Sequence, residues 1–197
     1  MRVIAGKAKG LRLAVVPGET TRPVMDRVKE AVFNILGTSL RGACFLDLFA
    51  GTGSVGIEAL SRGAAQATFV EREDRAVKVI GANLKTTALG EQARVLRRDV
   101  FRFIAAEADG RYDFIYVAPP QYQELWAKTL LALDEHDAIL AEDGQIVVQI
   151  FPKEYHELEL AHFEPLDERK YGSTLVVFYG RKQASVAEAG DEEALAG

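Results

Sequence analysis

The sequence has few of the residues that build metal centres and disulfide frameworks. Its 197 residues include one cysteine, Cys44, and three histidines, His136, His156 and His162. One cysteine cannot form an internal disulfide, which fits a reducing cytoplasm. A zinc site needs about four cysteine or histidine ligands at close spacing. We therefore expect a cytoplasmic protein without a metal centre.

Long apolar runs are also missing. No stretch reaches the roughly 18 apolar residues of a transmembrane helix, so no membrane attachment is expected. The first residues, MRVIAGKAKGLRL, lack the apolar core of a signal peptide. Neither a Gly-x-Ser-x-Gly elbow nor a P-loop motif is present, which argues against a serine hydrolase and a P-loop nucleotide hydrolase.

Positive charge is scarce over most of the chain and concentrated at one end. The net charge of −5 alone argues against a nucleic-acid-binding protein. Residues 1–41, however, carry a net charge of +5, whereas residues 42–197 carry −10. A basic arm on an acidic body indicates a polyanionic partner. The same residues could also serve only to keep a small amphipathic segment in solution.

From Cys44 onwards, predicted strands alternate with predicted helices, as judged from their hydrophobic periodicity. This alternation predicts an α/β fold with a mostly parallel, Rossmann-like sheet. The final strand pattern, ERKYGSTLVVFYG, splits at Gly172-Ser173 into an antiparallel hairpin. The expected parallel strands are residues 44–50, 67–73, 93–99, 112–120 and 145–151, and the expected helices are 54–64, 75–89, 100–108 and one that ends near Leu140, with 155–163 as helix or loop.

The two ends of the chain differ from this core. Residues 2–16 alternate apolar and basic residues between glycines, which predicts a small β-hairpin. A helix follows as far as Leu36, with Thr21 as its N-cap and Pro23 in its first turn. Residues 182–197 are rich in alanine, glutamate and glycine, as disordered tails are. We expect a basic extension (1–41), an α/β domain (42–181) and a tail (182–197).

A glycine-rich turn joins the first core strand to its helix. Gly51, Gly53 and Gly56 match the Gly-x-Gly-x-x-Gly pattern, and Glu71 follows at the end of the next strand. Glycines let the backbone turn tightly and approach a ligand closely. An acid at the position of Glu71 suits the hydroxyl groups of a ribose. The pattern therefore predicts a ligand that contains a nucleoside.

Acids at the strand ends separate two candidate ligands. Asp47 ends the first strand, where a carboxylate would repel the pyrophosphate of a dinucleotide. S-adenosylmethionine has no phosphate, and its ammonium and sulfonium groups would be attracted. Asp99 ends the third strand, at the same sheet edge, where it could accept a hydrogen bond from an adenine amine. These positions favour S-adenosylmethionine over NAD.

Several further segments resemble one family of RNA-modifying enzymes. MRVIAGKAKGLRL, TRPVMDRVKEAVFNIL, LDLFAGTGSVGIEALSRGA, FVERE with a downstream Asn83, and RKYGSTLVVFY are similar to segments of the RsmD family. This family of class I methyltransferases methylates the exocyclic N2 of a guanine in small-subunit (16S) ribosomal RNA. The resemblance covers about residues 1–180. It is most specific in the block TRP-x-x-DRVKEA-x-FNIL, since many unrelated enzymes share the glycine turn.

The resemblance implies a seven-stranded methyltransferase sheet, S-adenosylmethionine as cofactor, and ribosomal RNA or the small subunit as partner; we also expect a monomer. Together with the charge pattern it implies two sets of binding residues, separated along the chain. Removal of residues 1–20 is therefore expected to leave cofactor binding nearly intact and to abolish RNA methylation. Cofactor contacts are implied for Asp47, Phe49, Gly51, Gly53, Glu71, Asp99 and Val100, and RNA contacts for Lys7, Lys9, Arg12, Arg22 and Arg27.

The chain departs from this family at the catalytic motif. After the fourth strand the family has Asp-Pro-Pro-Phe or Asp-Pro-Pro-Tyr, whereas this chain has Ala118-Pro119-Pro120-Gln121-Tyr122. In the family, the Asp side chain and the first proline carbonyl hold the guanine amine, and the aromatic ring stacks on the flipped base. Gln121 and Tyr122 are candidates for the missing acceptor and ring. We expect a slower reaction, because the loss of one preorganised contact costs about 10²–10³ in rate.

Three other functions remain open. A related methyltransferase could act on another base or on a protein amide, and a homologue with the altered motif could bind the cofactor with weakened activity. An NAD-linked oxidoreductase is the least favoured. Cytosine C5 methylation is not expected, because its cysteine nucleophile lies near the fourth strand or later, whereas Cys44 begins the first strand and is expected in the core.

Overall fold

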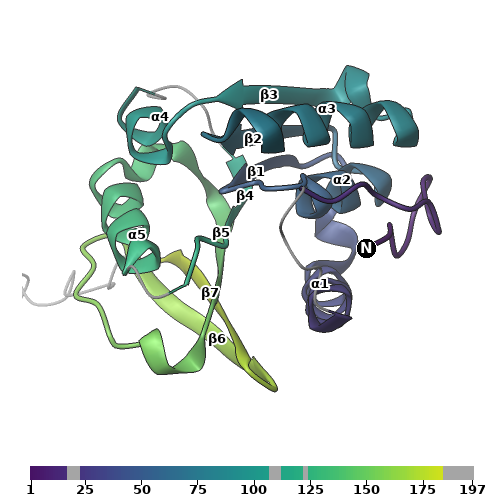
Figure 1. Cartoon of the computed structure of the whole chain (residues 1–197). Helices are drawn as coiled ribbons and strands as arrows, with labels where there is room; N and C mark the ends of the chain where they lie inside the picture. The colour runs from purple at the N-terminus through teal and green to yellow at the C-terminus, as the bar shows by residue number, and fades with distance from the viewer. Residues whose placement is uncertain (17–22, 107–111, 122–123, 184–197) are drawn as a thin grey trace, which may run out of the picture.

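The computed structural model describes residues 1–16, 23–106, 112–121 and 124–183 (Figure 1). Seven strands form one sheet in the order β3-β2-β1-β4-β5-β7-β6, which confirms the predicted seven-stranded α/β fold. Within the described residues, no helix is long and apolar enough to cross a membrane. The strands are β1 (Cys44–Leu48), β2 (Gln66–Glu71), β3 (Ala93–Arg97), β4 (Tyr112–Val117), β5 (Leu140–Ile150), β6 (Phe163–Tyr171) and β7 (Thr174–Arg181).

The strand order fixes where a ligand can bind. Strands β1 to β5 run parallel, and β7 pairs antiparallel with both β5 and β6, as predicted for the C-terminal hairpin. The chain moves outward from β1 to β2 and β3, and then returns to β4 on the other side of β1. In open α/β sheets, ligands bind beyond the carboxyl ends of the strands at such a reversal. The carboxyl ends of β1 and β4 are therefore the expected centre of the site.

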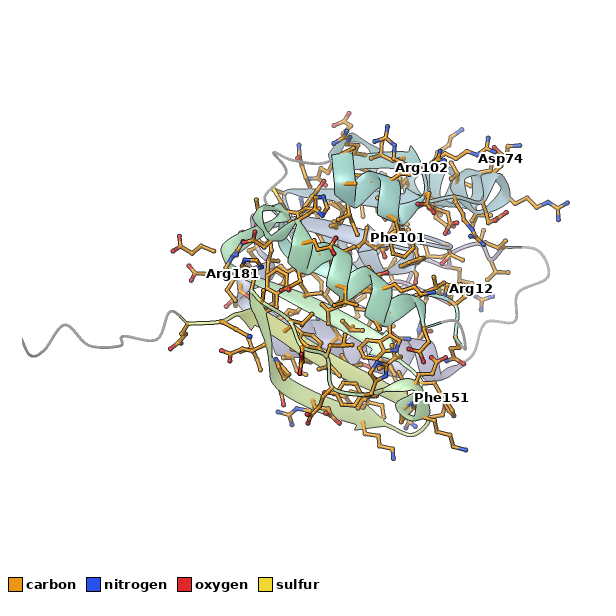
Figure 2. All side chains as sticks on the ribbon, turned by 90° about the vertical axis from the view of Figure 1, so that its left-hand side faces the viewer. Arg12, Asp74, Phe101, Arg102, Phe151 and Arg181 are labelled. Carbon is orange, nitrogen blue, oxygen red and sulfur yellow. The ribbon has the colours of Figure 1, made fainter. Side chains whose placement is uncertain are left out.

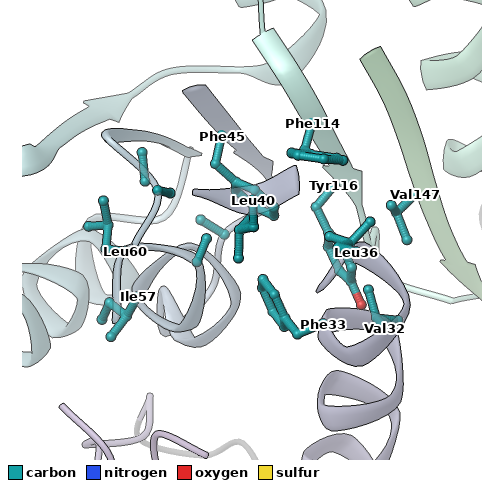
Figure 3. Close-up of a cluster of buried hydrophobic side chains, with 14 of the residues drawn as sticks. Val32, Phe33, Leu36, Leu40, Phe45, Ile57, Leu60, Phe114, Tyr116 and Val147 are labelled. Atoms are coloured by element: carbon teal, nitrogen blue, oxygen red, sulfur yellow. The ribbon is translucent and has the colours of Figure 1, made fainter. Parts of the chain in front are cut away.

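Helices cover both faces of the sheet (Figure 1). One face packs against α1 (Pro23–Leu36), α2 (Ser54–Ser61) and α3 (Asp74–Thr87), and the other against α4 (Val100–Ala106) and α5 (Leu125–Glu135). Figure 3 shows the first of these cores, where Phe33 and Leu36 of α1 approach Phe45, Phe114 and Tyr116 of the sheet. Burial on both faces explains why the central strands have apolar residues at nearly every position.

Residues 1–14 follow the surface of α2 as a loop, so the predicted β-hairpin is confirmed only in part. Arg2 and Arg12 form a single antiparallel bridge. The loop is attached to Ser61, whose hydroxyl accepts a hydrogen bond from the Ala8 N–H at 2.9 Å. At Gly6, φ is +82° and an added Cβ would lie 1.8 Å from the Ser61 carbonyl oxygen, so only glycine fits there.

Other boundaries shift relative to the sequence prediction. Helix α1 begins at Pro23 as expected, and the predicted N-cap Thr21 lies outside the described residues. Near the end of this helix, the side chain of Ile35 is 44% exposed. Helix α5 ends at Glu135, before the predicted Leu140, which instead begins β5. Residues 155–162 form no regular helix, and β6 starts earlier than predicted. Cys44 is half-buried at the start of β1.

A buried charge cluster joins the N-terminal loop to the helices. The carboxylate of Glu58, fully buried on α2, accepts hydrogen bonds from the N–H groups of Ile4 and Ala5 at 2.8 and 3.0 Å. It also pairs with Arg62 at 2.8 Å and with the buried Lys29 of α1 at 3.5 Å. Burial lowers the pKa of Lys29, although the charges of Glu58 and Asp26 oppose this shift. Lys29 therefore belongs to the interior and adds no charge to the surface of the basic extension.

Removal of the Glu58 carboxylate is expected to destabilise the protein strongly. Glu58→Ala leaves Lys29 buried and breaks two bonds to the N-terminal loop, at a cost of about 3–5 kcal/mol in the free energy of unfolding. Urea denaturation measures this change. The exposed Glu142 of β5 provides the control, since Glu142→Ala should change stability by less than about 0.5 kcal/mol. Equal effects of the two substitutions would contradict the assigned role of Glu58.

Candidate active site

A cleft of about 450 Å³ opens at the carboxyl ends of the central strands. It contains Phe49 and Gly51 of the glycine turn, Glu71 at the end of β2, and the Pro119-Pro120 segment after β4. Figure 2 views the molecule from the side of α4 and α5 and labels Phe101, another lining residue. Eight predicted site residues line this one cleft: Phe49, Gly51, Glu71, Asp99, Val100, Ala118, Pro119 and Pro120.

The three glycines of the turn have different structural roles. Gly51 has φ of +55°, and a Cβ there would have nothing nearer than the Phe49 carbonyl oxygen at 3.9 Å, so its backbone is open to a ligand. Gly53 has φ of +73° and is the N-cap residue of α2. At Gly56 an added Cβ would lie 2.4 Å from the Phe69 ring, so this glycine serves helix–sheet packing. Phe49, with φ of 59°, holds a backbone conformation that bulky residues rarely adopt.

Two carboxylates occupy the N–H groups of this turn. Asp47 accepts a hydrogen bond from the Gly56 N–H at 2.9 Å. Glu71 accepts from the N–H groups of Gly51 and Glu73, both at 2.9 Å. In a dinucleotide site, the glycine turn and helix N-terminus offer their N–H groups to the pyrophosphate. Here the protein's own acids take two of these donors, which argues against NAD.

The buried acid of the turn favours a cationic ligand. Burial raises the pKa of Asp47 from 3.8 to about 7; the nearby Glu71 charge also raises it, and the Gly56 hydrogen bond opposes the shift. Burial and the Asp47 charge also raise the pKa of the neighbouring Tyr116 hydroxyl, which therefore keeps its proton. A positive group in the cleft would stabilise the ionised Asp47.

The remaining strand-end acid also has a structural partner. The Asp99 carboxylate accepts a hydrogen bond from the Arg102 N–H at 3.1 Å and so caps α4. It is half-buried, lines the cleft beside Val100, and remains a predicted contact for the adenine.

The altered catalytic segment is placed only in part. Ala118 and Pro119 are half-buried and line the cleft, as does the exposed Pro120. Gln121 is exposed and is not among the lining residues, and Tyr122 lies outside the described residues. The replacement of the missing acid and ring by these two residues therefore stays a prediction.

Asn83 connects the N-terminal segment to the glycine turn. Its fully buried amide accepts a hydrogen bond from the Ala14 N–H at 2.7 Å and donates to the Ala14 and Thr52 carbonyls at 3.1 and 2.9 Å. Val16 then lines the cleft. These contacts connect residues 14–16 to the cleft, so removal of residues 1–20 is now expected to weaken cofactor binding; the outcome of that deletion stays a prediction. Asn83 stood out in the sequence only as part of a resemblance, and no local pattern indicates this contact.

The predicted RNA-binding residues are exposed where the structure describes them. Lys7, Lys9 and Arg12 project from the N-terminal loop, and Arg27 projects from α1. Arg22 lies outside the described residues.

Known proteins share the whole of this architecture. A family model described as "Conserved hypothetical protein 95" matches residues 1–180. The chain belongs to this family. The resemblance to the RsmD family inferred from the sequence is thereby confirmed.

Two curated relatives of this RsmD-family chain are similar over most of their length. A Bacillus subtilis (strain 168) protein named "Putative rRNA methyltransferase YlbH" is 41% identical over 190 residues, which are 92% of this chain and 100% of that protein. The Escherichia coli (strain K12) protein named "Ribosomal RNA small subunit methyltransferase D" is 35% identical over 149 residues, 76% of this chain and 74% of that protein. A solved structure named "Putative methyltransferase yhhF from Escherichia coli" superposes with a TM-score of 0.82 at 31% identity, over 92% of this chain and 98% of that one.

The raised pKa of Asp47 predicts a specific dependence of stability on pH. The folded protein holds the Asp47 proton more tightly than the unfolded chain, so its free energy of unfolding falls as pH rises from about 4 to about 7. The full effect of such a shift is about 4 kcal/mol. Asp47→Asn keeps an acceptor for the Gly56 N–H and should remove this loss, which makes the variant more stable than the parent at pH 8 but not at pH 4.

Urea denaturation of parent and variant at both pH values measures the difference. The exposed Asp143 supplies the control, because Asp143→Asn should leave the pH profile unchanged. A stability difference between parent and Asp47→Asn that does not vary with pH would show that the Asp47 pKa is not raised.

Loss of the Asn83 amide should weaken the fold by about 2–4 kcal/mol, because Asn83→Ala removes two partly buried bonds to the Ala14 backbone and the buried bond to the Thr52 carbonyl. The matched control is Thr86→Ala on the same helix, where an exposed hydroxyl donates to the Ala82 carbonyl. Thermal unfolding of the two variants compares them. Similar melting temperatures would mean that the contact between the N-terminal segment and the turn contributes little.

Proposed function

We propose that this protein transfers a methyl group from S-adenosylmethionine to the exocyclic N2 of a guanine in small-subunit (16S) ribosomal RNA. The observation that carries the proposal is one cleft that joins the glycine turn to the Pro119-Pro120 segment, with the turn's N–H groups held by Asp47 and Glu71. Membership of the RsmD family and the names of the relatives, which refer to ribosomal RNA, support the same reaction.

The residues of the cleft fit S-adenosylmethionine. The open backbone at Gly51 admits close approach, and the Glu71 carboxylate suits the two ribose hydroxyls. Asp47 is buried behind the turn and is not itself among the lining residues, and its carboxylate would attract the ammonium and sulfonium groups of a ligand in the cleft. Val100 and Phe101 offer apolar surface for the adenine beside Asp99. When bound, the cofactor supplies an electrophilic methyl group on its positively charged sulfur.

The Pro-Pro segment would position the guanine amine. The N2 lone pair is delocalised into the ring, so acceptors that hold the amine hydrogens favour attack by directing the lone pair at the methyl carbon. The carbonyl of Pro119 is available whatever the side chains are, and the two prolines limit the backbone conformations of this segment. Ala118 offers no side-chain acceptor. Gln121 would provide the second acceptor, and Tyr122 the ring that stacks on the base.

Methyl transfer from labelled S-adenosylmethionine to 16S ribosomal RNA and to small subunits, followed by nucleoside analysis, tests the proposal. N2-methylguanosine is the expected product. Label in another nucleoside or in protein would identify a related methyltransferase with a different acceptor. Cofactor binding without any transfer would identify a homologue that has lost the activity.

Restoration of the family's acid should accelerate the reaction. Ala118→Asp adds a second acceptor for the guanine amine and should raise turnover at least tenfold, within the roughly 10²–10³ of one preorganised contact. Single-turnover methylation of RNA measures the rate, and calorimetry with S-adenosylhomocysteine should find little change in cofactor affinity. Ala118→Leu, which adds bulk without an acceptor, is the control.

The companion variant Gln121→Ala should lower turnover without weakening cofactor binding. A lower rate for Ala118→Asp would instead show that the site has been rebuilt around alanine. If neither Ala118→Asp nor Gln121→Ala differs from an active parent, residues 118–122 are not the catalytic segment.

A further inference from the structure

Four arginines from three segments surround a single hollow beside the cofactor cleft. Arg72 follows β2, Arg97 and Arg98 lie at the end of β3, and Arg102 lies in the first turns of α4; we call these residues the arginine cluster. The hollow measures about 500 Å³ and is open to solvent. Arg72 and Arg98 line both the hollow and the cofactor cleft, so the two spaces adjoin.

Nearby acids neutralise the arginine cluster only weakly. Arg72 lies 3.3 Å from Glu73, and both side chains are 70% exposed. Arg97 lies 3.4 Å from Asp74, which also pairs with Lys78 at 2.7 Å. Exposed pairs of this kind contribute only about 0–1 kcal/mol.

The other two members of the cluster have fewer partners still. Asp99 also lines the hollow, and its carboxylate bonds to the backbone N–H of Arg102 rather than to the guanidinium. Within the described part of the chain, the side chains of Arg98 and Arg102 have no carboxylate partner. The cluster therefore retains positive charge that the protein does not compensate.

This concentration of charge opposes the composition of the chain. The protein has a net charge of −5, and the sequence outside residues 1–41 has −10. Guanidinium groups brought together repel one another unless an anion lies between them. Arginine presents a planar set of donors that matches two phosphate oxygens at once. Exposed arginines around an open hollow thus fit the phosphates of a nucleic acid better than a small buried ligand.

We propose that the arginine cluster binds the phosphate backbone of the RNA substrate next to the target nucleotide. This inference rests on the proposed function. It gives the protein a second region of RNA contact besides the basic N-terminal segment, one that the sequence pattern does not indicate. Figure 2 shows Arg102 on α4 and Arg12 of the N-terminal segment at separate positions on the molecule. RNA held at both places would extend over the cleft, with the target base above the Pro119-Pro120 segment.

The test removes two arginines that line the hollow but not the cofactor cleft. Arg97→Ala/Arg102→Ala is compared with Lys85→Ala/Arg94→Ala, which removes the same charge near the amino-terminal edge of the sheet, at the end of α3 and in β3. The dissociation constant for 16S ribosomal RNA is measured at a series of salt concentrations in the presence of S-adenosylhomocysteine. Each lost phosphate contact should flatten the logarithmic salt slope by about 0.7 and cost about fivefold in affinity near 0.1 M salt.

The expected result is about twenty-five-fold weaker RNA binding by Arg97→Ala/Arg102→Ala, a slope flatter by about 1.4, and unchanged affinity for S-adenosylhomocysteine. The control variant should match the parent. A parental slope and affinity in the arginine variant would overturn the proposal, as would a parent that does not bind the RNA.

Failure of the proposed function would be seen separately. A parent that binds the RNA through the arginine cluster but transfers no methyl group to a guanine would contradict the assigned reaction and still support the RNA contact. Arg97→Lys/Arg102→Lys keeps the charge and should recover most of the salt slope.

Discussion

The buried carboxylate of Asp47 is the interaction on which the rest of the site depends. It accepts the Gly56 N–H and thereby ties the end of β1 to the start of α2, while Glu71 ties the end of β2 to Gly51. These bonds fix the glycine turn and hold the side chains of two buried acids, Asp47 and Glu71, close together. The raised pKa of Asp47 follows from this arrangement, and a cation is the ligand that offsets its cost.

The N-terminal residues form part of this arrangement rather than a separate arm. Glu58 and Asn83 are buried polar side chains that bond to the backbone of residues 4, 5 and 14. Buried polar groups of this kind are costly unless paired, so they hold the segment in one position. We therefore propose that residues 1–41 serve two purposes, as a wall of the cofactor cleft and as a basic surface towards RNA.

The sequence predicted the fold and much of the cleft because both follow from local patterns. Apolar strands, the glycine turn and the acids at the strand ends lie within short segments, and the parallel sheet brings them to one edge. Contacts across long separations were not predictable in the same way. The bond from Asn83 to Ala14 spans 69 residues, and in the arginine cluster the pairing of β2 with β3 brings Arg72 next to residues 97–102. These contacts favour weaker cofactor binding after removal of residues 1–20, the opposite of what the charge pattern suggested.

The most direct test of the account is the proton balance of cofactor binding. A cation in the cleft lowers the pKa of Asp47, so binding should release protons, about half a proton at pH 7 if the free value is about 7. Calorimetry of S-adenosylmethionine binding in buffers of different ionisation enthalpy measures this number, with Asp47→Asn as the comparison. The account predicts proton release in the parent, tighter binding as pH rises from 6 to 8, and neither effect in Asp47→Asn. Binding without proton release, or the same release in Asp47→Asn, would contradict it.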